Sequence, residues 1–525
     1  MLIIASAQYV DSELRSEFGD IPPAFLPVGN KRLFVRQVES FPKEDNVVIT
    51  LPEDFVMSVC DQKLIANRNI QVVYLDSLLS LRESIASVLN GLGEFKSPIK
   101  ILLGDTLFTS DIDADVSDVI SVSPTNDFYR WSGFFFEGGR LRLTDNVEKY
   151  DSELVVSGYF SFSDISVLKD SLINSDSFIG AIDNYAFVKD LKVVRMDEWL
   201  DFGHVHTYFK SKSKLTTQRS FNEMRITPKV VYKNSKNKEK MLAEYGWFKN
   251  IPAELKIYTP HVLDYTCSEE RAGYGIEYLY MTALNELAVF GRLPAVVWRN
   301  ILSSCNEFLL EAKKYSSDDI SIEQINTFHN EKIFERLARY SNDSGLDLKK
   351  PWTFNGYQIP SITDMAMHCC ALIRSVRTSD ICVSHGDLCF SNMLYDFRSQ
   401  GIKVIDPRGV LNDGQLTVYG DARYDVAKLL HSIVGRYDVI IAGLCNVTID
   451  NYSIDFSFYD ESQYSIISAE ARKINFGGYP QEEIIPIVIN LFFSMLPLHA
   501  DDSRRQNCLL ANAMRLYWEF LGNKK

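Results

Sequence analysis

The sequence has few of the features that mark metal clusters, disulfide frameworks or nucleic-acid binding. Its nine cysteines are scattered, only Cys369 and Cys370 are adjacent, and no C-x-x-C pair or His/Cys cluster occurs. An odd, dispersed set excludes a zinc ribbon and argues against a disulfide framework, so we expect a reducing cytoplasm. The net charge of −14 supplies no basic surplus, which excludes a general nucleic-acid binder.

The chain also lacks a long uninterrupted apolar run. Its first residues have no basic segment ahead of their short apolar stretch, so we expect a buried β-strand there and no signal peptide. The most apolar later run, "IIPIVINLFFSMLPLHA" from Ile484, is short and contains Pro486 and Pro497. We interpret it as a buried helix and expect no membrane span.

The sequence has the length and composition of a multidomain globular protein. It contains 525 residues, of which 46% are hydrophobic and 24% charged, and this length favours two or three domains. Apolar runs at 2–7, 46–52, 70–76 and 99–105 are rich in β-branched residues and end in small, polar or turn residues. They predict strands of a parallel sheet covered on both faces. The polar and basic segment 209–220 is the best candidate for a linker.

Beyond this segment the pattern changes. Residues 226–235 predict a strand, and 236–251 predict an amphipathic helix. Helical periodicity dominates from about Leu284, is interrupted by a strand pair within 381–406, and resumes to the end of the chain. The sequence therefore predicts an α/β domain followed by an α+β domain with a large helical half.

The stretch "SHGDLCFSNMLYDFRSQGIKVIDPRG", residues 384–409, contains Asp387, Asn392 and Asp406 at spacings of five and fourteen residues. His385, Asp387 and Asn392 reproduce the H-x-D-x-x-x-x-N loop of kinases, and Asp406 ends an apolar strand. Phosphoryl transfer needs a carboxylate that receives the acceptor proton and oxygen ligands for magnesium. The pattern predicts that Asp387 is the base and that Asn392 and Asp406 hold the metal; a loop capped by Asp and Asn is the alternative.

This stretch, together with "GDARYDVAKLLHS" at 420–432, resembles the aminoglycoside phosphotransferase and choline kinase superfamily over roughly residues 219–525. The resemblance implies a bilobal protein-kinase-like fold that uses ATP and Mg²⁺ to phosphorylate the hydroxyl of a small molecule. It assigns Asp387 as catalytic base and Asn392 and Asp406 as metal ligands.

The same resemblance places the remaining ATP-binding residues. Lys233 ends a predicted strand, and Glu244 follows eleven residues later in a predicted helix; they match the phosphate-binding lysine and its ion-pair partner, with Lys229 as the rival lysine. Ser220 lies in the segment 219–224, which has the position of the phosphate-covering turn but contains no glycine. The hinge, where adenine would meet backbone groups, is expected at Glu277 and Tyr278.

Four fragments in the first two hundred residues resemble sugar-phosphate nucleotidyltransferases. They are "PPAFLPVGNKRLFVRQVE" from Pro22, "ILLGDTLF" from Ile101, "VEKYDSELVVSGYFSFSD" from Val147 and "DEWLDFGHVHTY" from Asp197. The resemblance implies an α/β, Rossmann-like fold with a mostly parallel sheet. It assigns Asp105 and Asp201 as metal ligands and the pair Glu148 and Lys149 as contacts of the sugar phosphate.

Two features depart from that family. Its glycine-rich loop, which cradles a triphosphate through backbone amides, is replaced by a segment with no glycine before Gly19. Arg15 is the candidate for the arginine of this loop. Pro23 stands where a lysine is expected, although Lys31 is retained.

Together these observations predict a nucleotidyltransferase-like domain at 1–212 and a kinase-like domain at 213–525, with a small lobe at about 219–280 and a large helical lobe at about 281–525. We expect a bifunctional cytoplasmic enzyme that phosphorylates a sugar or amino alcohol and then couples the product to a nucleotide, with Mg²⁺, ATP, and CTP or another nucleoside triphosphate. Such an enzyme would supply an activated unit for capsule or lipopolysaccharide.

Two alternatives remain open: a kinase fused to an inactive nucleotide-sugar-binding module, and a wholly non-catalytic interaction protein. The acceptor of the kinase is equally open. Asp501 and Asp502 are candidates for holding a cationic amine, and Arg504 and Arg505 for holding an anion, with exposed surface charge as the alternative for all four.

Overall fold

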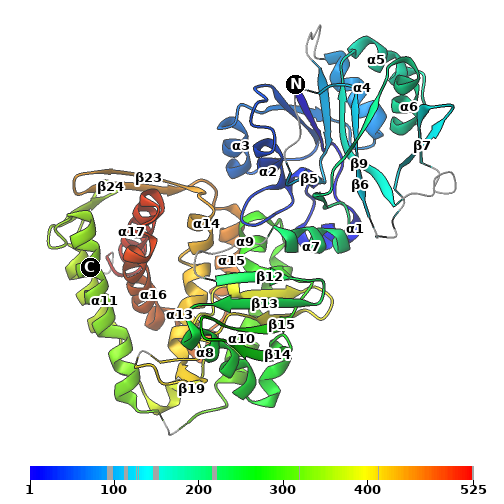
Figure 1. Cartoon of the computed structure of the whole chain (residues 1–525). Coiled ribbons are helices and arrows are strands. Elements are labelled where there is room, and N and C mark those ends of the chain that lie inside the picture. Colours follow the sequence, from blue (N-terminus) through cyan, green and yellow to red (C-terminus); the bar gives the residue numbers. More distant parts are fainter. Residues whose placement is uncertain are drawn as a thin grey trace. The chain divides into compact units, whose positions relative to one another are not determined.

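The chain divides into two compact units, Met1–Leu215 and Thr216–Lys525. The computed structural model describes residues 1–91, 98–110, 116–125, 127, 129, 131–145, 153–215, 222–317, 320–411 and 413–522, without the side chains of 222, 223 and 326–331. In Figure 1 the first unit runs from blue to cyan-green and the second from green to red.

A seven-stranded sheet forms the centre of the first unit. Its strand order is β10-β6-β9-β4-β1-β2-β3. Four pairs of neighbouring strands are parallel: β1–β2, β1–β4, β2–β3 and β6–β10. Strand β9 runs antiparallel to both of its neighbours, β4 and β6. The strands are β1 (Leu2–Ala5), β2 (Val47–Pro52), β3 (Gln71–Leu75), β4 (Ile99–Leu103), β6 (Val119–Pro124), β9 (Leu154–Phe162) and β10 (Lys192–Arg195).

The four strands that the sequence predicts are thus confirmed, and they are parallel. Every residue of β2 is buried, as expected for a strand whose two faces are both covered. Ile3, Ile101 and Phe160 belong to one continuous apolar core with residues of the flanking helices. The helices that share this core are α4 (Leu81–Gly91), α5 (Ile165–Ile173) and α6 (Phe178–Val188). The unit also contains α1 (Ser12–Phe18), α2 (Leu33–Glu39) and α3 (Val59–Ala66).

The prediction of a linker at 209–220 is wrong for its first part. Helix α7 (Val205–Lys214) continues through residues 209–214, and 216–220 lie outside the described residues. Tyr208 and Phe209 are buried, and the Ser211 hydroxyl donates a hydrogen bond of 2.7 Å to the carbonyl oxygen of Asp201. Tertiary packing of two aromatic rings and this side-chain bond therefore outweigh the polar, helix-neutral composition of the segment.

The second unit begins with an antiparallel sheet of order β12-β13-β15-β14. Its strands are β12 (Asn222–Ile226), β13 (Val230–Ser235), β14 (Val262–Cys267) and β15 (Ala272–Glu277), and helix α8 (Lys238–Asn250) packs against β15 and β14. Figure 1 shows the four strands side by side, with α8 beside the sheet. The predicted strand and helix at 226–251 are confirmed as β13 and α8.

Helices make up most of the remainder. They are α9 (Leu284–Phe290), α10 (Ala295–Ala312), α11 (Ile322–Ser344), α12 (Ile362–Leu372), α13 (Ala422–Ile433), α14 (Tyr437–Ile441), α15 (Ser462–Ala471), α16 (Gln481–Met495) and α17 (Ser503–Tyr517). Helix α16 contacts α11, α12, α13 and α17. Short strands between them are β16 (Thr282–Ala283), β19 (Ile381–Val383), β20 (Met393–Asp396), β21 (Gly401–Val404) and β22 (Tyr419–Asp421).

The expectation that helices resume to the end of the chain after residue 406 is wrong at the short strand β22 and at a hairpin. Strands β23 (Cys445–Asp450) and β24 (Ser453–Phe458) form a hairpin, and β24 pairs with β17 (Trp352–Phe354), which pairs with β18 (Tyr357–Ile359). Residues 445–458 alternate buried and exposed positions, which is the period of a half-covered strand. The turn at Asn451, with a φ of 51°, closes the hairpin.

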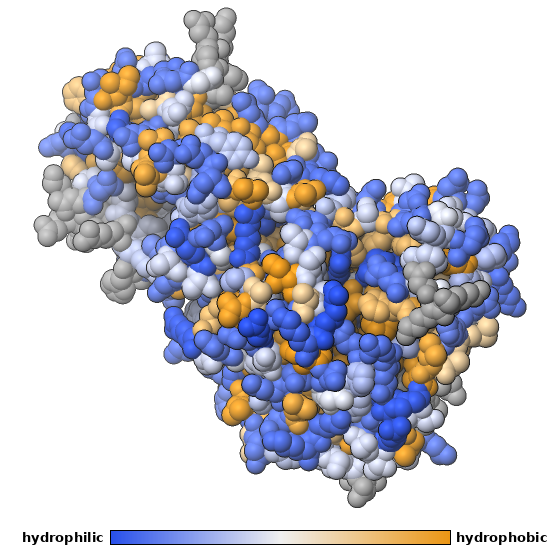
Figure 2. All heavy atoms as spheres, turned by 180° about the vertical axis from the view of Figure 1, so that it is seen from behind, coloured by the Kyte–Doolittle hydropathy of each residue, from blue (hydrophilic) through white to orange (hydrophobic). Residues whose placement is uncertain are grey.

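Helix α16 and the turn after it form the most apolar segment of this unit. Gln481–His499 is long and apolar enough to cross a membrane, but 67% of its apolar window is buried inside the protein. The surface in Figure 2 shows apolar residues in small groups between hydrophilic ones. The run from Ile484 is therefore a core helix packed against its neighbours, as the sequence predicts.

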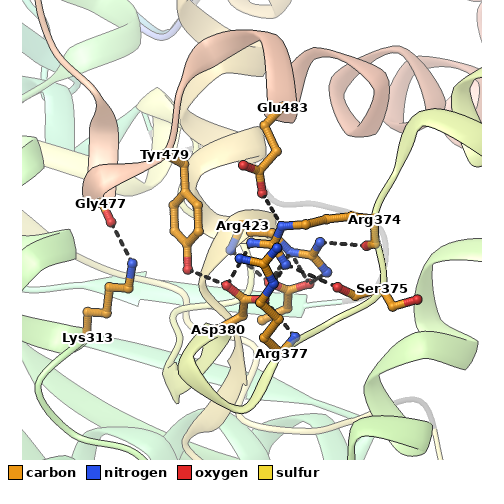
Figure 3. Close-up of polar contacts among 10 residues, drawn as sticks. Lys313, Arg374, Ser375, Arg377, Asp380, Arg423, Gly477, Tyr479 and Glu483 are labelled. Carbon is orange, nitrogen blue, oxygen red and sulfur yellow. Dashed lines mark hydrogen bonds and ion pairs between the residues drawn. The ribbon is translucent and has the colours of Figure 1, made fainter.

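A buried ionic cluster joins the segment after α12 to the start of α13 (Figure 3). Asp380 accepts hydrogen bonds from Arg374 at 2.6 Å and from the Tyr479 hydroxyl at 2.9 Å. Arg423, which is fully buried, pairs with Asp421 at 2.7 Å and donates to the carbonyl oxygen of Arg374 at 2.8 Å. These contacts fix the first turn of α13, whose next residues reach the candidate active site.

We expect Asp380→Asn to lower the free energy of unfolding by about 3 kcal/mol, because it removes the charge that Arg374 and Arg423 face in a buried site. The measurement is urea-induced unfolding of the full chain followed by tryptophan fluorescence. Asp343→Asn is the matched control, since Asp343 forms only an exposed pair with Arg339, and exposed pairs contribute about 1 kcal/mol or less. Equal midpoints for the two variants would contradict a structural role for the cluster.

Candidate active sites

The loop 384–392 in the second unit is held by backbone hydrogen bonds to one buried carboxylate. Asp425, in the first turn of α13, accepts from the amides of His385 and Gly386, both at 2.7 Å. Burial raises the pKa of Asp425 to about 6, an effect that the two amides and the Ser384 hydroxyl partly offset. The arrangement fixes the loop's direction relative to α13.

His385 supports the same loop from inside. Its ring is fully buried, Nε2 lies 2.9 Å from the carbonyl oxygen of Ile405, and Nδ1 lies 3.3 Å from the amide of Asp387. Burial lowers the pKa of His385 to about 4, so the ring is neutral at pH 7. The amide of Asp387 can only donate, so Nδ1 accepts and Nε2 carries the proton.

Gly386 is required by the chain that follows β21. Its φ is +76°, and a Cβ atom there would lie 2.7 Å from the Cβ of Arg408. A larger residue would therefore push the segment 406–409 away from the loop. From the other side, the indole of Trp247 on α8 donates to the carbonyl oxygen of Ser384 at 2.8 Å.

Asp387, Asn392 and Lys428 lie together at the end of this loop. The Asn392 amide nitrogen donates to the carbonyl oxygen of Asp387 at 2.9 Å and to its Oδ2 at 3.1 Å. Lys428 Nζ, from α13, lies 2.8 Å from Oδ1 of Asp387, whose side chain keeps 42% of its surface exposed. The carboxylate thus has one face on protein donors and another open to a ligand.

The surrounding charges decide the ionisation of Asp387. Loss of hydration opposes its negative charge, but the charge and hydrogen bond of Lys428, followed by His385 and Arg408, hold the pKa of Asp387 at about 2. Burial lowers the pKa of Lys428, but the charge of Asp387 more than offsets this and leaves it raised. Asp387 is therefore a carboxylate throughout the physiological range.

Lys233 links the antiparallel sheet to the segment after β21. Its Nζ lies 2.6 Å from Glu244 Oε2 on α8 and 3.1 Å from Asp406 Oδ1. Burial lowers the pKa of Lys233, but the charges of Asp406 and Glu244 outweigh it and leave it raised. Lys233 and Glu244 are both buried. Because its pKa is raised, Lys233 stays charged, and its ammonium group contacts both Glu244 and Asp406.

Asp406 has an unusual backbone conformation. Its φ is 59°, a left-handed value that costs most residues about 1 kcal/mol or more and recurs at functional sites. About a third of its side chain is exposed, at 36%. This conformation turns the carboxylate from the end of β21 toward Lys233.

Asn392 and Asp406 offer the hard oxygen atoms that magnesium prefers. The strands β20 and β21 pair antiparallel, and the amide of Ile405 donates to the carbonyl oxygen of Asn392 at 2.9 Å, which brings the two ligand-bearing segments together. In the part of the chain that the structure describes, no cluster of three or more His, Cys, Asp or Glu residues suited to a metal occurs. Two protein ligands completed by phosphate oxygens fit that composition.

The predicted hinge and phosphate-covering residues are placed as follows. Glu277 ends β15 and is exposed, and its amide donates to the carbonyl oxygen of His261 at 2.8 Å. The amide of Tyr278 donates to the carbonyl oxygen of Lys229 at 2.9 Å, and the Lys229 side chain is exposed. Ser220 lies outside the described residues.

In the first unit, two predicted metal ligands meet beside a short strand pair. Strands β5 (Thr106–Phe108) and β11 (Trp199–Asp201) are antiparallel, with Asp201 opposite Thr106. A Cβ atom at Gly203 would lie 2.8 Å from Asp105 Oδ2 and 3.4 Å from Asp201 Oδ1, so both carboxylates face the same glycine. Close approach of the two acids requires a residue without a side chain there.

The two carboxylates lack a full countercharge. Burial, and then the charge of Asp105, raises the pKa of Asp201 to about 7. Burial also raises the pKa of Asp105, although His204 and Thr106 partly offset it. Asp201 Oδ2 is buried and has no hydrogen-bond partner within the described ranges. A divalent cation would supply the missing charge and ligand contact, so the pair fits a metal.

Two of the predicted phosphate-binding cations of this unit form ion pairs with acidic neighbours. Arg15 on α1 pairs with Asp20 at 2.9 Å, and Lys31 pairs with Glu39 at 2.8 Å, all on the surface. Glu148 and Lys149 lie outside the described residues. In place of a glycine-rich cradle, the Ser6 amide donates to Thr50 Oγ1 at 2.8 Å, and Ser6 Oγ accepts from the Ala24 amide at 3.0 Å.

Sequence reasoning missed Asp425, Lys428 and Arg408, which hold or charge the loop of Asp387. Asp425 and Lys428 lie within the block 420–432 and are three positions apart, so they share one face of a helix. The spacing of Asp425 and Lys428 therefore indicates that both face the same part of the site. The sequence gives no such indication for Arg408, because its role depends on its contact with Gly386 in the folded chain.

Comparison with known proteins gives likenesses of fold only. No protein-family model and no curated protein sequence matches the chain. One similar solved structure is HddC from Yersinia pseudotuberculosis, with 16% identity and a TM-score of 0.32 over 41% of this chain and 99% of that chain. Another is an aminoglycoside-3'-phosphotransferase of type VIII, with 13% identity and a TM-score of 0.28 over 58% of this chain and 96% of that chain. A third is 4-diphosphocytidyl-2C-methyl-D-erythritol synthase from Anaerococcus prevotii, with 16% identity and a TM-score of 0.28 over 41% of this chain and 94% of that chain.

We expect Asp201→Asn to have opposite effects with and without a divalent cation. Without one, the variant should be more stable than the wild type by on the order of 1 kcal/mol, because a repulsive buried charge is removed. With Mn²⁺ or Mg²⁺, the wild type should gain stability and the variant should gain much less. Thermal unfolding with and without the cation measures both effects. Asp197→Asn is the control, since Asp197 pairs with Arg195 on the surface; a cation response equally lost in both variants would contradict the assignment.

Proposed function

We propose that the second unit transfers the γ-phosphoryl group of ATP to the hydroxyl of a small molecule. One observation carries the proposal: the buried cation Lys233 lies 3.1 Å from Asp406, while Asp387 and Asn392 contact each other on the adjoining loop. A cation for the phosphates, two oxygen ligands and an ionised carboxylate are the set that phosphoryl transfer needs. The non-catalytic alternative leaves this costly arrangement of buried charges without a purpose.

The residues divide the reaction between them. Lys233, oriented by Glu244, would hold the phosphates of ATP. Asn392 and Asp406 would hold a magnesium ion, whose charge offsets that of the β- and γ-phosphates. Asp387 orients the acceptor hydroxyl and receives its proton as the oxygen–phosphorus bond forms and the bond to ADP breaks. Lys428 keeps Asp387 ionised and carries positive charge to the same place, where negative charge develops on the transferred group.

We further propose that the first unit transfers a nucleotidyl group. A phosphate oxygen of the phosphorylated compound would attack the α-phosphorus of CTP or another nucleoside triphosphate, and pyrophosphate would leave. Asp105 and Asp201 would hold the divalent cation that this reaction uses. In this account the product of one unit is the substrate of the other, and the chain supplies an activated unit for a surface polysaccharide from the cytoplasm.

A specific observation favours a second candidate for the first unit, a nucleotide-sugar-binding module without catalysis. Arg15 and Lys31 are neutralised by Asp20 and Glu39, and their exposed pairs leave no cation committed to a triphosphate among these predicted residues. The raised pKa values of Asp105 and Asp201 support cation binding in either case.

For the kinase, we expect Asp387→Asn to lower phosphoryl transfer by about 10²- to 10⁴-fold, because the proton acceptor is lost. Lys233→Met should also lower it strongly, whereas Lys229→Met should not. The measurement is mass spectrometry of products formed by the full chain from ATP, Mg²⁺ and a panel of sugars, sugar phosphates, sugar acids and amino alcohols. Asp343→Asn is the matched control. Absence of transfer to every acceptor, or equal rates for wild type and Asp387→Asn, would contradict the proposal.

For the first unit, we expect pyrophosphate release with one of the four ribonucleoside triphosphates and a sugar phosphate, and its loss in Asp201→Asn. Removing a metal ligand leaves the reacting phosphate without its positive partner. A coupled pyrophosphate assay across the four triphosphates measures it, with Asp197→Asn as control. Binding of a nucleotide sugar without any turnover would instead establish the binding module.

A further inference from the structure

A cavity beside the loop of Asp387 is lined by three basic side chains. Lys332 and Arg336 come from α11, and Arg408 comes from the segment after β21. Residues four apart on a helix lie on one face, so Lys332 and Arg336 present their charges to the same space. None of the described residues that line the cavity is acidic.

The three cations are close enough to oppose one another. Burial lowers the pKa of Lys332, and the charges of Arg408 and Arg336 lower it further, while Glu335 partly offsets them. Burial also lowers the pKa of Arg336, with Arg408 acting in the same direction and Tyr424 and Glu335 in the opposite one. Arg336 donates to the carbonyl oxygen of Ser494 at 3.2 Å, which anchors it but adds no negative charge. An anion in this space would be attracted by all three side chains.

A residue with an unsatisfied acceptor atom lines the same cavity. Asn490 on α16 is 6% exposed and lines the cavity, and its amide nitrogen donates to Cys370 Sγ at 3.3 Å. Its Oδ1 atom is buried and has no hydrogen-bond partner in the described part of the chain. A buried carbonyl oxygen that accepts no hydrogen bond costs the folded protein about 1–3 kcal/mol of stability. A ligand hydroxyl would supply that donor.

The basic cavity shares two wall residues with a neighbouring cavity at the candidate catalytic loop. Arg408 and Tyr424 line it and also line a neighbouring cavity, whose other walls include Ser384 and Gly386 of that loop. The same Arg408 contributes to the charge that keeps Asp387 ionised. Arg408 therefore links the basic cavity to the loop that carries Asp387.

The alternative acidic site for an amine is weaker. Asp502 caps α17 by accepting from the Arg505 amide at 2.9 Å, and it pairs with the Arg505 side chain at 3.2 Å. Asp501 pairs with the same guanidinium at 3.5 Å. The two predicted amine-binding acids are thus engaged by a neighbouring cation.

We propose that the acceptor of the phosphoryl group is a hydroxyl compound that already carries an anionic group, held by Lys332, Arg336 and Arg408, with a hydroxyl on Asn490. The anionic group is a phosphate or a carboxylate, as in a sugar phosphate or a sugar acid. The role of this compound as phosphoryl acceptor rests on the kinase function proposed above. The binding of an anion in the cavity does not depend on that function.

Equilibrium binding tests the anion site without catalysis. The thermal midpoint of the full chain is measured with inorganic phosphate or acetate, against chloride at equal ionic strength, and with glucose 6-phosphate, gluconate, glucose and glucosamine. The anionic compounds should raise the wild-type midpoint more than glucose or glucosamine does. Arg336→Gln and Lys332→Gln should lose that difference, and Arg339→Gln, on the same helix but paired on the surface with Asp343, should keep it. The preferred probe distinguishes phosphate from carboxylate.

The function proposed for the first unit would also bind a sugar phosphate, so the α11 variants decide the origin of the response. A shift that Arg336→Gln and Lys332→Gln retain in full, or no difference between anionic and neutral compounds, overturns the anion site. Circular dichroism of each variant confirms that the fold is intact.

Steady-state transfer then tests the role of the site. For an anionic acceptor, Arg336→Gln should raise KM at least tenfold relative to wild type and Arg339→Gln, since the uniform binding of the anion is lost. Transfer to neutral or amino compounds at equal efficiency in all three proteins would overturn the inference and leave the kinase standing. Absence of all transfer would contradict the kinase, and the binding measurement would then still decide whether the anion site exists.

Discussion

The contact of Lys233 with Glu244 and Asp406 is the interaction on which the candidate kinase site depends. It joins a strand of the antiparallel sheet, the helix packed on that sheet and the segment that follows β21. A buried lysine with one acid would be electrically satisfied; a second acid, in a left-handed backbone conformation, adds a negative group that a magnesium ion and a nucleotide would use. The cost of this conformation and of burying Lys233 and Glu244 is explained by the ligand that the three residues would share.

The loop of Asp387 is positioned by a second set of constraints, all of which converge on α13. The Asp380–Arg374–Arg423 cluster fixes the start of this helix, Asp425 holds the loop backbone, and Lys428 reaches the candidate base. Because these residues lie on one helix, its position sets the direction of the loop and the charge of its carboxylate together. Tyr424, from the same turn, separates the catalytic loop's cavity from the basic one.

Much of this could be predicted from the sequence, for identifiable reasons. Asp387, Asn392 and Asp406 are close in sequence and separated by short strands, and Lys233 and Glu244 span one strand–helix turn, so local spacing carries their relation. Asp105 and Asp201 are far apart, and only the order of the fragments around them indicated a pair. The basic cavity could not be predicted, because Arg336, Arg408 and Asn490 meet only through packing of α11 and α16. The segment at 209–214 and the hairpin at 445–458 were misjudged because tertiary contacts outweigh local composition there.

In the proposed reaction, ATP held by Lys233 phosphorylates an anionic hydroxyl compound near Asp387. The most direct measurement is mass spectrometry of the products that the full chain forms from ATP labelled with ¹⁸O in the γ-phosphoryl group and a bacterial metabolite extract separated by anion exchange. The account predicts labelled phosphoryl groups on a compound from the retained, anionic fraction. Label found only in inorganic phosphate, or only on compounds from the unretained neutral and cationic fraction, would contradict it.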